Sequence, residues 1–69
     1  MTDREEQLLS ALALMAAQYL EQEDQLHLDH MFMSAGERAV KLLAEYGLAI
    51  DDGRNSRWTD AGLTFLKKH

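Results

Sequence analysis

The sequence predicts a mainly α-helical protein with three to four helices and one small two-stranded β-hairpin, folded as a single domain over residues 1–69. Apolar residues recur at helical spacing in three stretches, and a turn-rich DDGRNS segment separates two short alternating stretches. A chain of this length hides only about 60% of its unfolded surface when it folds. We therefore expect one thin core. Because the first predicted helix also has a wide apolar arc, we expect part of that arc to be buried against another chain, in a homodimer or in a complex with a partner.

The first helix is predicted to begin after Thr2. Thr2 and Glu5 have the spacing of a capping box, in which each side chain accepts a hydrogen bond from the other residue's amide. The apolar residues that follow occupy an arc of roughly 160° on a helical projection. They are Leu8, Leu9, Leu12, Met15, Ala16, Tyr19 and Leu20. Leu14 lies outside this arc, which makes it either an ordinary exposed leucine or a contact with a partner.

Residues 21–33 are compatible with two structures. Three apolar residues here would rotate away from the first helix's apolar face, so we expect a break near Gln22 to Gln25. Their i, i+3, i+4 spacing favours a second short helix capped by Asp24. The three residues are Leu28, Met31 and Phe32. Alternation of Leu26 and Leu28 permits a short strand instead.

Two histidines in this segment, His27 and His30, are three residues apart and could share one ion on a helix. A structural zinc site uses four ligands, and a catalytic one usually takes three from the protein. The nearby Asp29 would face elsewhere on a helix. We therefore expect no metal and no cofactor here, and we interpret these residues as polar neighbours of an apolar anchor.

The stretch from Ser34 to Gly47 is the clearest helix in the chain. Ser34 and Glu37 repeat the capping-box spacing, and Gly47 suits a left-handed C-cap because it has no Cβ. Charged residues line one side, and apolar residues line the other. The apolar residues are Ala39, Val40, Leu42, Leu43 and Tyr46.

A β-hairpin and a last helix are predicted after Gly47. The Asp52-Gly53 pair with alternating flanks indicates a hairpin whose Ile50 and Trp58 face the core. Thr59 can cap a helix that continues to His69. The predicted core consists of Leu9, Leu12, Ala16, Tyr19, Leu43, Tyr46, Ile50, Trp58, Leu63 and Leu66.

Charge is unevenly placed along the chain. The net charge is −5, and residues 1 to 35 carry seven acidic residues against Arg4 alone. Such a half favours basic partners and repels phosphate backbones, although a solvated, solubilising face is the plainer interpretation. The predicted partner-binding residues are Glu5, Glu6, Leu14, Glu21, Glu23 and Asp24.

Several functional classes are disfavoured by the composition. We find no phosphate-cradling glycine loop, no nucleophile with an identifiable base and no pair of opposed carboxylates, so we expect a protein that is not an enzyme. The chain has no cysteine, which makes a reducing compartment the default. It has neither a signal segment nor an apolar run of about 20 residues, so we expect a cytoplasmic protein that does not enter the membrane.

Residues 34–66 resemble the latter part of a winged-helix domain. The matching features are Gly47-Leu48 after a helix, Asp52-Gly53-Arg54 at a hairpin tip and Thr59-Asp60-Ala61-Gly62 before another helix. In the DNA-binding members of that family, the helix before the hairpin enters the major groove and the hairpin, or wing, touches the backbone. The resemblance implies DNA contacts by Ser34, Arg38 and Lys41, with Arg54 and Arg57 on the wing.

Two departures from that family favour a different function. Lys41 lies between Glu37 and Glu45 at i, i+4 spacing, so the charges of this helix neutralise one another, and the family's basic excess is absent. Our first hypothesis is a protein-interaction module, an adaptor or a small inhibitor of a nucleic-acid-handling protein, which binds a partner with a basic surface. The alternative is a dimeric DNA-binding transcriptional regulator.

Overall fold

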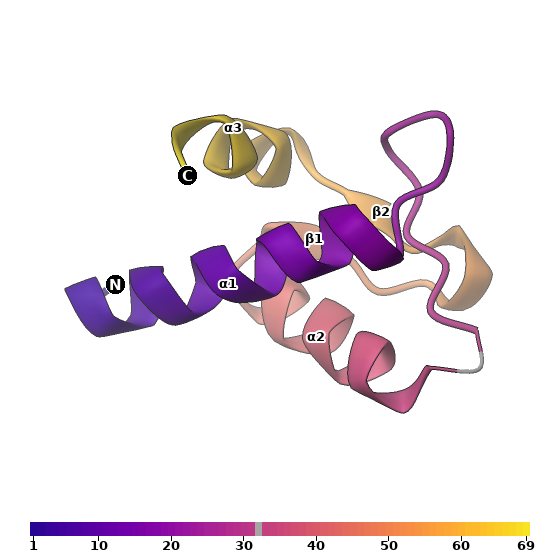
Figure 1. The fold of residues 1–69 in the computed structure, drawn as a ribbon, viewed down its shortest axis with the longest axis horizontal. Helices are drawn as coiled ribbons and strands as arrows, with labels where there is room; N and C mark the ends of the chain where they lie inside the picture. The colour runs from indigo at the N-terminus through magenta and orange to yellow at the C-terminus, as the bar shows by residue number, and fades with distance from the viewer. Residues whose placement is uncertain (32) are drawn as a thin grey trace.

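The computed structural model describes residues 1–31 and 33–69, and in these residues it has three α-helices, two short strands and one 3-10 turn (Figure 1). The order is α1 (Asp3–Tyr19), α2 (Ser34–Glu45), β1 (Ala49–Ile50), η1 (Gly53–Asn55), β2 (Arg57–Trp58) and α3 (Asp60–Lys68). Helix α1 crosses the molecule and contacts both α2 and α3. The predicted fold class, mainly α with a small hairpin, is confirmed. The arrangement is compatible with a winged-helix-like layout.

Helix α1 begins with the predicted capping box. The Thr2 hydroxyl accepts from the Glu5 amide at 3.1 Å, and the Glu5 carboxylate accepts from the Thr2 amide at 3.0 Å. The buried stripe of α1 is narrower than the predicted arc, because it is made by Leu9, Ala13 and Ala16. Tyr19, which was predicted in the core, is 71% exposed. That prediction is wrong because the stripe continues to Leu20 and leaves Tyr19 at its edge.

The predicted break after α1 is confirmed, but the second helix capped by Asp24 is wrong. The Asp24 carboxylate accepts from the amides of Leu26 and His27, both at 2.9 Å, and so closes a turn. Gln25 takes a positive φ of 57° within this turn. A side chain that binds nearby amides in this way competes with a helix for them. Phe32, a member of the predicted helix, lies outside the described residues.

The strand alternative for this segment is closer to the structure. The Leu28 amide donates to the Ser56 carbonyl at 2.7 Å, and the Trp58 amide donates to the Leu26 carbonyl at 3.0 Å. His27 and Arg57 form an isolated antiparallel bridge. Residues 26–28 therefore lie beside β2 like a short additional strand.

Helix α2 begins one residue earlier than predicted. Its N-cap is Met33, whose side chain makes no capping hydrogen bond, so the capping box of Ser34 and Glu37 is wrong. Ser34 is already helical, which means that its side chain is not in the N-cap position. At the other end, the predicted role of Gly47 is confirmed by its φ of 74°. Its amide bonds the Ala44 carbonyl at 3.0 Å, as in a Schellman motif.

The hairpin pairs β1 and β2 in an antiparallel register, with Ala49 opposite Trp58 and Ile50 opposite Arg57. Side chains of directly opposed residues lie on the same face of a sheet. Because Ala49 and Trp58 face the core together, Ile50 must face outward with Arg57. The prediction for Trp58 is confirmed by its 2% exposure, whereas the prediction for Ile50, which is 39% exposed, is wrong.

Helix α3 is capped by Thr59, as predicted. The Thr59 hydroxyl accepts from the Gly62 amide at 3.0 Å and donates to the Gly47 carbonyl at 2.6 Å. A Cβ on Gly62 would lie 1.9 Å from the Leu48 carbonyl oxygen, so the helix packs directly on the backbone before β1. Phe65 is the buried hydrophobic residue of this helix, and Leu63 and Leu66 are half-buried beside it.

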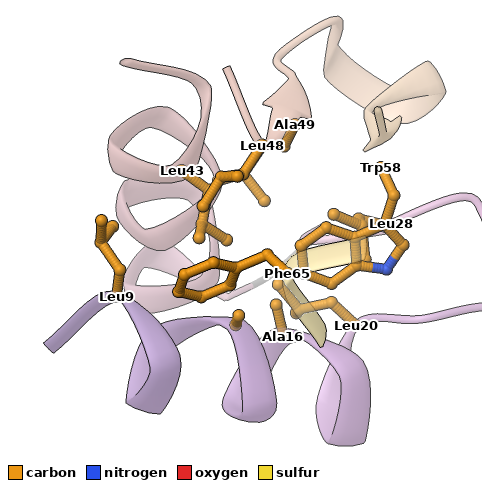
Figure 2. Packing of buried hydrophobic residues seen from close by; sticks show 11 residues of the cluster. Leu9, Ala16, Leu20, Leu28, Leu43, Leu48, Ala49, Trp58 and Phe65 are labelled. Carbon is orange, nitrogen blue, oxygen red and sulfur yellow. The ribbon is translucent and has the colours of Figure 1, made fainter. Parts of the chain in front are cut away.

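The core lies between α1, α2, α3 and the hairpin, and Figure 2 shows Phe65 reaching into it from α3. Its buried members are Leu9, Ala13, Ala16, Leu20, Leu28, Val40, Leu43, Leu48, Ala49, Trp58 and Phe65. Predicted core residue Leu12 packs against this cluster while half-buried. Tyr46 is 40% exposed, and its predicted burial is wrong because its phenol reaches Glu5 at the surface. Within the described residues, none of the helices combines the length and apolar composition that crossing a membrane requires.

Replacing Leu43, which is fully buried, with alanine should lower the free energy of unfolding by about 2–5 kcal/mol, because the cavity left behind cannot collapse completely. Leu42→Ala is the matched control on the same helix, since Leu42 is 44% exposed. Urea denaturation followed by circular dichroism measures both. Equal losses in the two variants would contradict the core described above.

Candidate functional site

An apolar groove of about 380 Å³ lies between α1 and α2. Leu8 and Leu12 contribute from α1, and Leu42 and Tyr46 contribute from α2 and its C-cap. Three of these side chains are well exposed, at 58% for Leu8, 44% for Leu42 and 40% for Tyr46. The full lining is Glu5, Leu8, Leu9, Ala11, Leu12, Leu42 and Tyr46.

The groove follows from how the two helices pack. Helix α1 buries the stripe that contains Leu9 and Ala13, so Leu8 and Leu12 fall beside it. Helix α2 buries Val40 and Leu43, which leaves Leu42 beside its stripe in the same way. The apolar face of each helix is therefore wider than the area that its neighbour covers.

Tyr46 and Glu5 are hydrogen-bonded to each other at one end of the groove. The Tyr46 hydroxyl donates to one oxygen of Glu5, and the Thr2 amide donates to the other at 3.0 Å. The Tyr46 bond, followed by the bonds from Thr2, lowers the pKa of Glu5 to about 2. The same bond is the main cause that raises the pKa of Tyr46, with a smaller contribution from the charge of Glu45. At neutral pH this end of the groove therefore carries an ionised carboxylate.

The six residues predicted to bind a partner do not gather in one place. Glu5 and Glu6 lie in the first turn of α1, whereas Glu21, Glu23 and Asp24 follow its last turn. A helix of 17 residues is about 25 Å long, so two acidic regions lie at opposite ends of α1. Leu14 lies between them at 43% exposure and does not line the groove.

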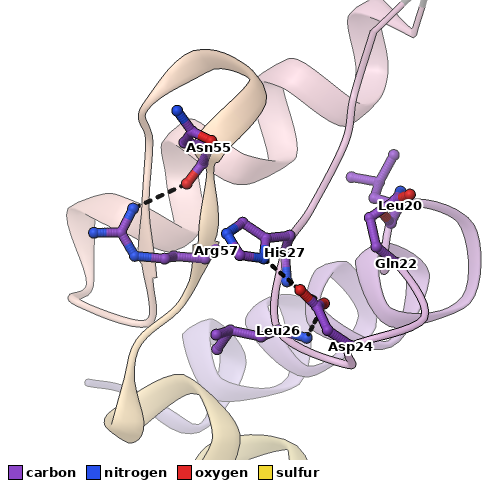
Figure 3. A network of polar contacts seen from close by, with 7 residues as sticks. All are labelled: Leu20, Gln22, Asp24, Leu26, His27, Asn55 and Arg57. Atoms are coloured by element: carbon purple, nitrogen blue, oxygen red, sulfur yellow. Dashed lines mark hydrogen bonds and ion pairs between the residues drawn. The ribbon is translucent and has the colours of Figure 1, made fainter.

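Several of these carboxylates already have partners within the fold. Glu21 accepts from the Trp58 indole at 2.8 Å, and the Glu6 carboxylate lies 3.4 Å from His69 Nε2. Asp24 lies 2.5 Å from His27 Nδ1 in addition to its two backbone bonds, as Figure 3 shows. The backbone bond from His27, then its ring and the Leu26 amide, lower the pKa of Asp24 to about 2. These bonds hold the turn after α1 in place.

The remaining polar contacts at this turn are also structural. Arg57 donates to the Asn55 carbonyl at 2.9 Å, which braces the hairpin beside His27 (Figure 3). Across the described residues, His, Asp and Glu side chains form no cluster of three that could hold a metal ion.

The predicted DNA-contacting residues occupy the surface of α2 and the hairpin. Ser34, Arg38 and Lys41 are exposed on α2, and Lys41 Nζ lies 3.4 Å from Glu37. Arg54 at the hairpin tip donates to the sulfur of Met31 at 3.2 Å, three residues before α2 begins. The tip and the start of α2 therefore lie at the same end of the molecule (Figure 1).

Glu5 is the lining residue that the sequence predicted to bind a partner, whereas the leucines and Tyr46 in the lining were predicted only as parts of helix faces or of the core. The signal for the groove was the wide apolar arc of the first helix, which exceeds what a single neighbouring helix can cover. The position of Leu42 and Tyr46 opposite that arc could not be read from the chain, because it depends on how α1 and α2 cross.

Comparison of the chain with protein-family models, with curated proteins and with solved structures found no match. Function therefore has to be inferred from the groove, from the charges around it and from the surface of α2.

Replacing Tyr46 with phenylalanine should raise the pKa of Glu5 from about 2 towards its ordinary value of 4.5, because the largest cause of the lowered value is removed. A lowered carboxyl pKa stabilises the fold above pH 4.5, and this contribution is lost as the pH falls towards 2. The variant should therefore lose less stability over that range. An NMR titration of the Glu5 side-chain carboxyl measures the change.

Tyr19→Phe is the control, since Tyr19 lies at the far end of α1 and is 71% exposed. It should leave the titration of Glu5 unchanged. An unchanged titration in Tyr46→Phe as well would contradict the assigned bond.

Proposed function

We propose that this protein is a non-enzymatic protein-interaction module, which uses a winged-helix-like scaffold to bind a partner with a basic surface. It acts as an adaptor or as a small inhibitor of a nucleic-acid-handling protein. The observation that carries the proposal is the open apolar groove between α1 and α2, which has an ionised carboxylate at one end. Such a combination suits a protein surface that offers both apolar and basic side chains.

The composition of the groove supports binding more than catalysis. Its lining contains two titratable side chains, Glu5 and Tyr46, and they are bonded to each other. That bond keeps Glu5 ionised and Tyr46 protonated across the neutral range, as their pKa shifts indicate. General acid–base catalysis works best with groups whose pKa lies near the working pH. This pair is poorly placed for it.

The charge distribution supports a basic partner. Residues 1 to 35 carry seven acidic residues and one basic residue, and the first turn of α1 contributes Asp3, Glu5 and Glu6. Complementary charge speeds the encounter of two proteins and selects among partners. A phosphate backbone would be repelled by the same field.

A second candidate function is a DNA-binding regulator. It is favoured by the position of Arg54 near the start of α2, because a wing and a recognition helix would then approach DNA together. The pairing of Lys41 with Glu37 and the net charge of −5 count against it, because non-specific affinity comes from uncompensated cations.

Titration with duplex DNA over a range of salt separates the two candidates. We expect no binding even at low salt. Four phosphate contacts would produce a log–log salt slope of about −4, which would be reduced in Arg38→Ala and Arg54→Ala. Lys67→Ala, which removes the same charge from α3, is the matched control. Binding with that slope, which becomes shallower by about one unit in each of the first two variants and stays unchanged in the third, would establish the regulator instead.

Affinity capture from nuclease-treated extract of the native host tests the interaction directly. The parent protein should retain a defined protein at physiological salt. Glu5→Lys should lose it, because the charge at the end of the groove is reversed. Capture that is equal for the parent and this variant would count against a basic partner at this surface.

A further inference from the structure

We propose that the groove between α1 and α2 binds an amphipathic, positively charged α-helix of the partner. Apolar side chains of that helix would lie on Leu8, Leu12 and Leu42, and a lysine or arginine would lie beside Glu5. The inference rests on the proposed function for the class of partner. It adds the surface that is used and the structure of the segment that is bound.

The spacing of the lining residues suits a helix. Leu8 and Leu12 are one turn apart on α1, and Leu42 and Tyr46 are one turn apart along α2 and its C-cap. Two neighbouring rows of apolar side chains that are only partly covered can take the apolar stripe of a third helix between them. From Glu5 to Leu12 the groove follows α1 for about 10 Å, so it would contact about two turns of the bound helix.

Charge gives the bound helix a direction. Glu5 lies at one end of the groove, and the exposed Glu45 directly precedes Tyr46, which lines the groove at that same end. The last turn of α2 has no basic residue, and its C-terminal carbonyls add partial negative charge there. Arg4 in the first turn of α1 offsets part of this charge. At the other end, Arg38 lies one turn before Leu42. A bound helix is therefore best placed with its cationic residue next to Glu5.

A second copy of the chain suits this groove less well. The groove has seven lining residues, whereas a stable interface of standard size uses about 20–30 residues and about 800 Å² on each side. Two copies joined along α1 would also bring together helices that each carry Asp3, Glu5 and Glu6 against Arg4. Like charges across an interface are unfavourable.

A synthetic helical peptide with leucines at i, i+3, i+4 and i+7 and lysines elsewhere is the direct probe. Two control peptides keep its length: one has the same residues in an order that spreads leucine around the helix, and one has glutamate in place of lysine. Fluorescence anisotropy at physiological salt should show binding of the first peptide, with at least about tenfold weaker binding of both controls.

Protein variants locate the binding. Leu8→Ser combined with Leu42→Ser should weaken the peptide at least about tenfold, because both side chains would contact its leucines. Leu14→Ser is the matched control, since Leu14 is similarly exposed on α1 outside the groove. The affinity of this variant for the peptide should stay within about twofold of that of the parent protein. Glu5→Gln should weaken binding and reduce its dependence on salt. Circular dichroism confirms that each variant is folded.

The possible results distinguish a failure of the groove inference from a failure of the proposed function. Chemical-shift changes at the methyl groups of Leu8, Leu12 and Leu42 would support the inference. Binding that is unaffected by the groove variants, with shifts near residues 21–24, would overturn the inference and leave a basic partner in place. If none of the three peptides bound and the protein bound DNA in a salt-dependent way, both the groove inference and the proposed interaction module would be overturned. A particle of twice 7.9 kDa in sedimentation, dissociated by the groove variants, would assign the groove to a second copy and also overturn the inference.

Discussion

The indole of Trp58 is buried to 2% exposure at the place where most of the chain meets. Its ring nitrogen donates to Glu21 at the end of α1, and its amide donates to the Leu26 carbonyl. In the hairpin it lies opposite Ala49, and its ring comes within 3.0 Å of the position of a Cβ on Gly62 in α3. The backbone and side chain of this one residue therefore contact the turn after α1, the opposite strand of the hairpin and α3. A buried indole N–H needs a partner, which is why Glu21 belongs to the fold.

The open groove follows from the size of the chain. A domain of 69 residues has too few elements to cover both sides of a helix as long as α1. Ala13 and Ala16 let the neighbouring elements approach α1 closely along one stripe, which concentrates the core there. Leu8 and Leu12 lie beside that stripe and contribute to the groove. The groove is therefore uncovered because the core packs against the neighbouring stripe of α1 and does not extend over Leu8 and Leu12.

Local chemistry made part of the fold predictable from sequence. The caps at Thr2 and Thr59 and the turn at Gly47 depend on residues within four positions of one another, and all three are observed. One local prediction failed, because Ser34 is already helical and does not form the capping box with Glu37. The other failures involve contacts with distant parts of the chain. Hairpin register turned Ile50 outward, and a turn closed by Asp24 replaced a helix beside β2. The groove required knowledge of which face of α2 meets α1, so the sequence indicated only a wide apolar arc and the acidic residue at its start.

The net charge of −5 does not by itself locate a binding site, because several of the acidic residues are already bonded within the fold. Glu21 satisfies Trp58 and Asp24 closes the turn after α1, so these carboxylates act within the fold. Glu5 is bonded to Tyr46 as well, but it also lines the groove and remains ionised there. In such an arrangement, burial of the leucines would provide most of the affinity, because apolar area removed from water is the larger favourable term. The carboxylate would decide which helices bind and in which direction, because charge acts mainly on specificity and on the rate of encounter.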